Sequence, residues 1–571
     1  MATAVIAAGA TAYWVSQDME ESGESNAILA FVPADTPVFS GQLTPFPIKA
    51  YINSISQNYQ NYPDDMFVEL EESDDVRAKF MLNLTQTYME SLESGDKFVS
   101  TFGLPEQMRS YFYTLGLLPV VKLEVEKPEV VWAVLDKAEQ DSGFTHEKKS
   151  IKGQEYRAYR LTDEDESETI SLLLSISNGI LTVTLDSSFI QRDTLETALG
   201  LAPVANSLAD SGILQDIMKA HGFNGDGIGY INHQELVTAI TTKDGNQLAR
   251  QLTALAELEG EDPFAIIRSN ECHTELSAIA ANWPRTVLGA SNVSISDTQS
   301  HIEFATIVES KNQVILDALS SMRGFIPEYV RNSNDSVFSM GLGIDASQLV
   351  PALTSIWDDM LTPQYQCVVL QEVQQEVSGQ SPAMLGMFTG MANGVQGVAA
   401  SLIDYKFSDD QDNPALENVD AIISLSTQNP SALFNMVKSF VPDLSDIQLK
   451  DNGEEIDLTY LLELPPELGI RPKMAIKGEH LVLYTGKVGE EQANKLADEA
   501  LSNNGIYSLA VDYGKMMTPI IAFSEMTGEP LPEELLMMED YNMQVKMGID
   551  VNSTGIILNS IVDNKVTPAG E

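Results

Sequence analysis

The chain has 571 residues, 43% of them hydrophobic and 20% charged, so it can bury substantial cores and form more than one domain. Its 83 acidic and 33 basic residues give a formal net charge of −50. This charge excludes nucleic acid and anionic membrane surfaces as partners, because clusters of Lys and Arg are needed to neutralise phosphate.

The first 15 residues, MATAVIAAGATAYWV, are apolar and small, and the acidic segment SQDMEESGESN follows them. The apolar run is shorter than the roughly 20 residues that span a bilayer, and Ala10-Thr11-Ala12 fits a cleavage site for export. The first Lys is Lys49, so the basic start of an ordinary signal is missing. We predict that residues 1–27 are an atypical signal peptide with a linker or, if the natural start lies upstream, an anchor in the inner membrane.

Residues 28–60 contain FVPADTPVFSGQLTPFPIKAYINSI, which predicts a short strand followed by a helix. The segment Val32-Pro33-Ala34-Asp35-Thr36 resembles the motif of a family of uncharacterised exported bacterial proteins, which open with a hydrophobic residue and then Pro-Ala-Asp-Thr. That family has no assigned activity. The resemblance therefore implies export and supplies no site residues.

A module of strand, helix, strand and β-hairpin is predicted twice, at 120–185 and at 422–484. Across the first strand and the helix, equivalent residues differ by 302 positions, and a proline suits the first turn of each helix. Past the helix the difference becomes 300, and near the start of each half Val38-Phe39-Ser40 aligns with Val337-Phe338-Ser339. The equivalent pairs include Leu123 with Leu425, Pro128 with Pro430, Val131 with Leu433, Gly153 with Gly453, Ile176 with Ile476 and Leu181 with Leu481.

Each half closes on alternating strands, and Asn-Gly turns between strands indicate hairpins. The prediction is an α+β fold made of two tandem modules, each an antiparallel sheet covered by helices. The first module covers residues 28–315 and the second covers residues 325–566.

Two cysteines, Cys272 and Cys367, are consistent with an oxidising compartment and at most one disulfide. They fall on opposite sides of the predicted boundary, so a bond between them would clamp the two halves. The alternative is a pair of unrelated buried thiols. Two cysteines alone exclude a cysteine-rich zinc site.

The Met/Gly-rich stretch MLGMFTGMANGVQGVAASL has the most unusual composition in the chain. Met384, Met387, Met391 and Val395 recur at intervals of three and four residues, which predicts one flexible apolar face of a helix. This face either packs in a core or serves as an adaptable surface for a lipid or a protein partner.

Several motifs resemble chemical sites but lack required residues. Residues 341–346, GLGIDA, fit a dinucleotide loop, yet the sequence predicts no parallel crossover unit around them. A calcium-like loop near Gly227 has Gly222 and His233 where acidic ligands belong, and His146-Glu147 has Ser150 in place of the second histidine of a zinc protease. We therefore predict no catalytic residue, no metal site and no cofactor.

The sequence thus favours an exported protein of the Gram-negative envelope, in the periplasm, that is not an enzyme and acts by binding or as a structural component, with an envelope protein as one partner class. The first alternative is a carrier of a lipid or other apolar ligand in a cleft between the two lobes. A hydrolase whose His, nucleophile and carboxylate meet only in space is the second alternative.

Overall fold

The computed structural model describes residues 27–566 except 57–67, 164–168, 189, 203, 387–389, 391, 393, 409–415, 441–443, 446, 452, 465–469, 529, 533–534, 536–537 and 539–540. The predicted export segment therefore lies outside the described residues, apart from Ala27. The chain divides into two compact units. Unit 1 comprises residues 1–309, 365–371 and 563–571, and unit 2 comprises residues 310–364 and 372–562. Among the described helices, none has the length and hydrophobicity needed to cross a membrane.

Unit 1 is built on an antiparallel sheet, as the sequence predicts. Its described strands follow the spatial order β4, β5, β6, β7, β3, β2, β1, β8, β9, β10, with every neighbouring pair antiparallel. Asn178 and Gly179 turn the chain between β6 and β7 with φ of 51° and 75°, as the Asn-Gly pair predicts for a hairpin. The strands are β1 (Val38–Gly41), β2 (Ser110–Leu115), β3 (Leu118–Glu124), β4 (Glu147–Ile151), β5 (Gln154–Arg160), β6 (Ile170–Ser177), β7 (Ile180–Ser187), β8 (Ile228–Asn232), β9 (Arg285–Ser296) and β10 (Gln299–Glu309).

One face of this sheet carries a continuous row of buried side chains. Residues that pair directly across strands lie on the same face, and a row of such partners runs through Leu173, Val120, Tyr113, Phe39 and Tyr230. All five side chains are buried, and large aromatic rings fill the centre of the row. The core of unit 1 is therefore continuous from β6 to β8.

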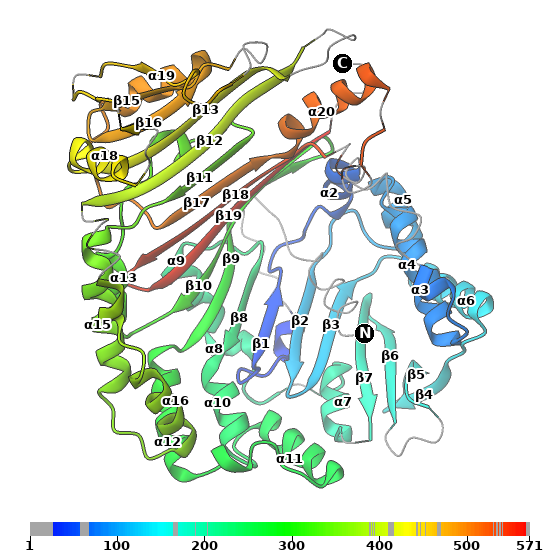
Figure 1. Ribbon diagram of the computed structural model, residues 1–571. Helices are drawn as coiled ribbons and strands as arrows, with labels where there is room; N and C mark the ends of the chain where they lie inside the picture. The colour runs from blue at the N-terminus through cyan, green and yellow to red at the C-terminus, as the bar shows by residue number, and fades with distance from the viewer. Residues whose placement is uncertain are drawn as a thin grey trace. The chain divides into compact units, whose positions relative to one another are not determined.

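The opposite face of unit 1 is covered by the helices that follow β1 and β3. In one cluster Phe80 of α4 and Leu135 of α6 pack with Leu181 of β7, and in another Ile52 of α2 and Phe98 of α5 pack with Val293 of β9. These helices also contact one another and lie together in Figure 1. They are α2 (Ile48–Ile55), α3 (Val68–Glu71), α4 (Val76–Ser91), α5 (Gly95–Phe102) and α6 (Pro128–Ser142).

The remaining helices of unit 1 lie between β7 and β9 in the sequence. They are α7 (Arg192–Ala198), α8 (Leu208–Ser211), α9 (Ile213–His221), α10 (His233–Thr241), α11 (Gln247–Glu259) and α12 (Asn270–Asn282). The predicted disulfide is confirmed: Cys272 of α12 is bonded to Cys367. Because residues 365–371 belong to unit 1, the bond lies within that unit, and the interpretation as a clamp between two halves does not apply.

Unit 2 is also built on an antiparallel sheet. Its described strands follow the order β14, β15, β16, β13, β12, β11, β17, β18, again with every neighbouring pair antiparallel, and β19 follows β18 after a turn. The strands are β11 (Phe338–Leu342), β12 (Val395–Phe407), β13 (Leu416–Thr427), β14 (Ile456–Asp457), β15 (Lys473–Lys477), β16 (His480–Thr485), β17 (Tyr507–Asp512), β18 (Met543–Asn552) and β19 (Gly555–Lys565).

The core of unit 2 lies on one face of its sheet. Tyr329 of α14 and Leu496 of α19 pack against Ile422 and Val482 in the centre of this face. The helices are α13 (Gln313–Ser321), α14 (Glu328–Arg331), α15 (Ala346–Leu361), α16 (Val368–Ser378), the 3-10 turn η4 (Pro382–Leu385), α18 (Pro430–Lys438), α19 (Gly486–Leu496) and α20 (Tyr513–Thr527).

The alignment of Val38-Phe39-Ser40 with Val337-Phe338-Ser339 differs by one residue from the register that the 302-residue offset between Val120 and Ile422 requires. Phe39 shares a cross-strand row with Val120, through Tyr113. Ile422, which is 302 positions after Val120, shares its row with Ser339. Because a one-residue slip turns every side chain to the other face of a sheet, the 302-residue offset pairs Phe39 with Ser339, whereas the alignment of the two Val-Phe-Ser segments pairs it with Phe338.

Candidate functional site

The face of the unit 2 sheet opposite its core carries three adjacent rows of apolar side chains, which we call the open face. Each row consists of residues that pair directly across neighbouring strands. The central row is Ile456, Met474, Leu483, Ile423, Ala400, Met340, Leu509 and Met547. The flanking rows are Ile476, Leu481, Leu425, Val398, Leu342, Tyr507 and Ile549 on one side, and Thr485, Ala421, Leu402, Phe338, Val511 and Val545 on the other. Ile476, at the end of the first of these rows, is buried.

Large side chains of the open face reach solvent. Met340, Leu342, Val398, Ile423, Met547 and Ile549 are each 37–49% exposed, and they come from β11, β12, β13 and β18. Single exposed apolar residues are normal on protein surfaces, but a contiguous apolar patch marks a place where something binds. The open face is such a patch, because its exposed residues alternate with half-buried apolar ones along the same rows.

The small residues of the same strands face the core instead. In β11, Ser339 and Gly341 are buried while Met340 and Leu342 on either side of them are exposed. Ser401 of β12 is also buried. The usual arrangement of a half-buried strand, with large apolar residues inside and polar residues outside, is therefore inverted here.

Hydrogen bonds compensate the burial of these hydroxyl groups, since an unpaired buried hydroxyl would cost stability. The Oγ atoms of Ser339 and Ser401 are 2.7 Å apart and share a hydrogen bond. Ser424 of β13 is 2.8 Å from the Oη of Tyr329. At β11 and β12 the core of unit 2 is thus closed by small polar contacts, and the bulky apolar side chains of β11 lie on the other side of the sheet.

Helix α20 covers one end of the open face. Tyr405 of β12 lies on that face, because it pairs with Val419, two residues before Ala421, and its hydroxyl donates a hydrogen bond to the carbonyl of Met516. The ring of Phe407 lies 4.5 Å from that of Phe523. Figure 1 shows α20 beside the ends of β12 and β17, which it contacts together with β18.

The predicted Met-rich helical face is not a continuous helix. Met384 lies in η4 and is 72% exposed, whereas Val395 is the first residue of β12, so the prediction of one helix through both residues is wrong. Met387 and Met391 lie outside the described residues. Val395 pairs with Thr427, two residues after Leu425, which places Val395 at the margin of the open face. Helical spacing misled the prediction because the apolar residues of a short turn and of a strand happened to follow it.

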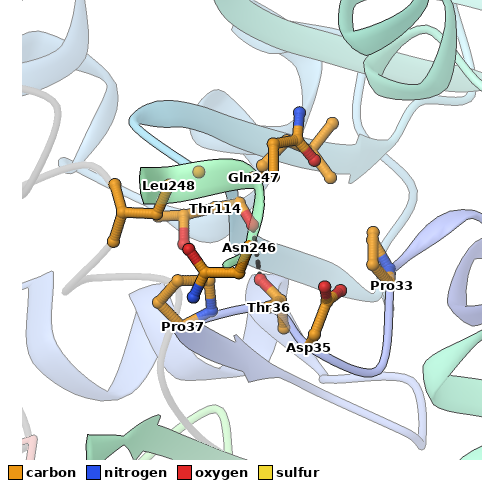
Figure 2. Close-up of a pocket in the computed structure, with 10 residues that line it drawn as sticks. Pro33, Asp35, Thr36, Pro37, Thr114, Asn246, Gln247 and Leu248 are labelled. Atoms are coloured by element: carbon orange, nitrogen blue, oxygen red, sulfur yellow. Dashed lines mark hydrogen bonds between the residues drawn. The ribbon is translucent and has the colours of Figure 1, made fainter. Parts of the chain in front are cut away.

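A small pocket in unit 1 lies beside the Pro-Ala-Asp-Thr segment. Figure 2 shows Thr36 between Pro33 and the start of α11, where Asn246 is the N-cap and Gln247 the first residue, with the Thr36 hydroxyl donating to the carbonyl of Thr114. The pocket encloses about 220 Å³, part of which is open to solvent. Ligand pockets usually hold 300–1,000 Å³, so this one is too small for an organic ligand. The motif thus fixes the start of β1 through hydrogen bonds to its neighbours.

A Ser–His pair occurs in unit 2 but is inaccessible. The Oγ of Ser426 is 2.9 Å from Nδ1 of His480, and Nε2 of the same ring is 3.0 Å from the carbonyl oxygen of Glu499. Nε2 must therefore carry the proton, and Ser426 donates to Nδ1. Both side chains are almost completely buried, and burial lowers the pKa of His480. The Ser426–His480 hydrogen bond connects β13 to β16, and because both side chains are buried, a substrate cannot reach them.

Lys122 is the most unusual charged group in unit 1. Its Nζ is buried between β3 and α7, where it donates to the hydroxyl of Thr182 at 3.0 Å and to the carbonyl of Ala198 at 2.8 Å. Within the described part of the chain, no carboxylate contributes to the pKa of Lys122, which burial alone shifts. Burial without an opposite charge lowers the pKa of Lys122 to about 8.

His301 of β10 is held between two carboxylates of unit 1. Its Nδ1 is 2.7 Å from Asp563, and its Nε2 is 3.0 Å from Glu303. Burial lowers the pKa of His301, but the hydrogen bonds to the two carboxylates outweigh this effect and raise the pKa above its usual value of 6.5. The protonated ring therefore fastens the last residues of β19 to β10.

The Asp563→Asn variant is expected to lower the pKa of His301, since one of the two anions that stabilise the imidazolium is removed. An NMR titration of the His301 ring protons measures this change, and the other five histidines are internal controls. In the native protein this contact contributes stability below pH 6.5 and loses it as the pH rises through the raised pKa. An unchanged His301 titration in the variant would contradict the assignment.

Two further features bear on the earlier predictions. Among the described residues, no group of three or more His, Cys, Asp or Glu side chains is placed to hold a metal ion.

The open face of unit 2 was not predicted from the sequence. The signal that could have revealed it is the alternation of Ser or Gly with large apolar residues in β11 and in 395–402, which is typical of a strand whose small side faces a closely packed core.

Comparisons with models of protein families, with curated proteins and with solved structures found no match to this chain.

Proposed function

We propose that this chain is an exported protein of the cell envelope that is not an enzyme and that binds an apolar partner through the open face of unit 2. The observation that carries the proposal is the row of exposed Met340, Ile423 and Met547 on the open face. This face is covered in part, by α20 at one end and around the buried Ile476, which pairs with Leu481. Keeping large apolar groups in water costs about 25 cal/mol for each Å² of apolar surface, so a folded protein retains such a patch where it has a use.

The placement in the envelope is part of this proposal. The bond between Cys272 and Cys367 supports it, because disulfides persist in oxidising compartments and are rare in the cytosol. The apolar, small-residue segment at 1–15 and the resemblance of Val32-Pro33-Ala34-Asp35-Thr36 to a family of exported proteins point the same way.

We also propose that the two units arose by duplication of one module. The repeated leucines support this: Leu123 pairs with Leu181 in unit 1, and Leu425 pairs with Leu481 in unit 2. The next strands agree as well, since Leu181 pairs with Ile176 and Leu481 pairs with Ile476. Helices α6 and α18 both begin at the repeated prolines, and the strand orders of the two units match when these pairs are superimposed.

The two units differ on the face that matters for binding. In unit 1, α4 and α6 pack against Leu123 and Val183. The corresponding residues of unit 2, Leu425 and Leu483, belong to the open face, and the equivalent of Val121 is the exposed Ile423. Under the duplication, unit 2 has kept the apolar residues and lost part of their cover.

The test is methionine oxidation of the protein isolated from cells without detergent, compared with the same protein after a hydrophobic resin has stripped its apolar ligands. We expect Met340 and Met547 to oxidise several-fold more slowly in dilute hydrogen peroxide before stripping, because an occupied face is shielded. Met360 of α15 is the matched control, since its exposure of 43% is close to the 40% and 37% of Met340 and Met547. Equal oxidation rates of Met340 before and after stripping would overturn the proposal.

A further inference from the structure

We infer that the occupant of the open face is the acyl chains of a zwitterionic diacyl phospholipid. This inference rests on the proposed function, because it identifies the ligand of that same face. It follows from three properties of the face: its lack of hydrogen-bonding groups, its lack of charge and its dimensions.

The open face offers almost nothing to which a polar ligand could bind. Of the residues in its three rows, only Tyr507 and, at the end of one flanking row, Thr485 carry a polar side-chain atom, and the backbone groups of the strands are already paired with their neighbours. A protein partner normally forms about one hydrogen bond for every 100–200 Å² of interface. Hydrocarbon needs none, so it fits this surface better than a folded partner does.

Charge selects further among apolar ligands. The three rows contain no Lys, Arg, Asp or Glu. A free fatty acid would bring a carboxylate that has no cation to meet on the face, and a second copy of this chain would bring another net charge of −50. A phospholipid of zero net charge keeps its headgroup in water and presents only its acyl chains.

The dimensions of the face suit more than one acyl chain. The central row joins Ile456 to Met547 across seven strand spacings of about 4.8 Å, or roughly 34 Å. One leaflet of a bilayer holds its acyl chains within about 15 Å, half of the hydrocarbon thickness. The row is therefore about twice as long as one acyl chain, so the face has room for both chains of the lipid, and the flexible side chains of Met340, Met474 and Met547 can adjust to them.

The experiment uses the full chain, stripped of ligand, mixed with phosphatidylcholine vesicles that contain a small fraction of pyrene-labelled phosphatidylcholine. Uptake separates the labelled lipids and raises the fluorescence of pyrene monomers, and flotation then removes the vesicles. We expect the protein to retain labelled lipid after flotation, and we expect Met340→Lys and Ile423→Lys each to reduce the retained amount at least tenfold. Leu462→Lys is the control, because Leu462 is equally exposed in unit 2 but lies outside the open face, and its uptake should stay within twofold of the native value.

Circular dichroism and thermal unfolding of each variant establish that it is folded, which the partial exposure of Met340 and Ile423 favours. Palmitate, offered to the stripped protein in place of the vesicles, is the second probe. Retention of palmitate without retention of phosphatidylcholine would overturn the inference, as would phosphatidylcholine uptake that survives both lysine variants. No uptake of either probe, together with protection of Met340 from oxidation in the unstripped protein, would also overturn it and leave the proposed function standing with a protein as the partner. Loss of that protection as well would mean that the proposed function itself is wrong.

Discussion

Replacing Cys272 and Cys367 together by serine is expected to lower the free energy of unfolding of unit 1 by about 4 kcal/mol. The two cysteines are 95 residues apart in the sequence, and a disulfide that closes so long a loop removes much of the conformational entropy of the unfolded chain. Without the bond, the segment 365–371 is held to α12 by weaker contacts. Chief among these are two hydrogen bonds, of 2.8 and 3.0 Å, from the amides of Gln366 and Cys367 to the carboxylate of Glu275.

Urea denaturation of the full chain, with hydrogen exchange to assign the transition to unit 1, measures the effect. Amides 366 and 367 should exchange much faster in the double-serine variant than in the native protein. Glu275→Gln is the comparison: it keeps the bond, weakens only the two hydrogen bonds and should cost about 1 kcal/mol. A double-serine variant that loses less than Glu275→Gln would show that the bond adds nothing to unit 1.

The stability of unit 1 is expected to rise by about 2 kcal/mol between pH 7.5 and pH 9.5, because of Lys122. Burial lowers the pKa of this side chain to about 8 in the folded protein, from the ordinary lysine value of 10.5 that applies to an unfolded chain. Between these two values the unfolded chain binds a proton that the folded one has released. Since stability increases with pH wherever the unfolded state binds more protons, the sign of the effect is a gain.

The Lys122→Met variant should abolish this rise, because methionine fills a similar volume without a titrating group. Lys137→Met, on the exposed side of α6, is the matched control and should keep the native pH dependence. The measurement is urea denaturation at half-unit steps of pH, ending at pH 9.5. Burial raises the pKa of five tyrosines of unit 1, so their ionisation on unfolding opposes the gain as the pH approaches 10. The contribution of Lys122 is therefore the difference between the native profile and that of Lys122→Met. A native profile as flat as that of Lys122→Met would refute the assignment.

Local signals in the sequence predicted much of the fold. Pro128 and Pro430 mark the first turns of α6 and α18, and Asn429 accepts a hydrogen bond from the amide of Ala432 as an N-cap should. The pair Asn178-Gly179 predicted a hairpin, which the structure confirms. These predictions succeeded because each depends on the conformation of only a few neighbouring residues.

The open face could not be predicted in the same way. A strand such as Phe338-Ser339-Met340-Gly341-Leu342 shows which residues share a face, but it does not show which face a helix will cover. The usual rule places the larger apolar residues inside, and here it fails, because α14 and α19 pack against the side that carries Ser339. That choice depends on helices that are distant in the sequence.

Two polar contacts of unit 1 could not be predicted either, because they also join residues that are far apart in the sequence. His301 meets Asp563 after 262 residues, and Lys122 meets the carbonyl of Ala198 after 76. No spacing rule links such partners, so the sequence did not distinguish His301 from the other five histidines of the chain. The disulfide was predictable only because there were two cysteines to pair.

Unit 1 is built from three segments that are far apart in the sequence, which has a consequence for biosynthesis. Cys272 finds its partner at residue 367, and Ser300 and His301 find theirs at Asn564 and Asp563, after the whole of unit 2 has been made. A nascent chain emerges from its N-terminal end, so the unit that is translated first is the last to be finished. A prematurely terminated product would leave β10 without these contacts and, if it ended before residue 367, Cys272 without its bond. Unit 1 therefore reaches full stability only in chains that have been translated past Asn564, which makes its resistance to proteases a readout of translation through the whole of unit 2.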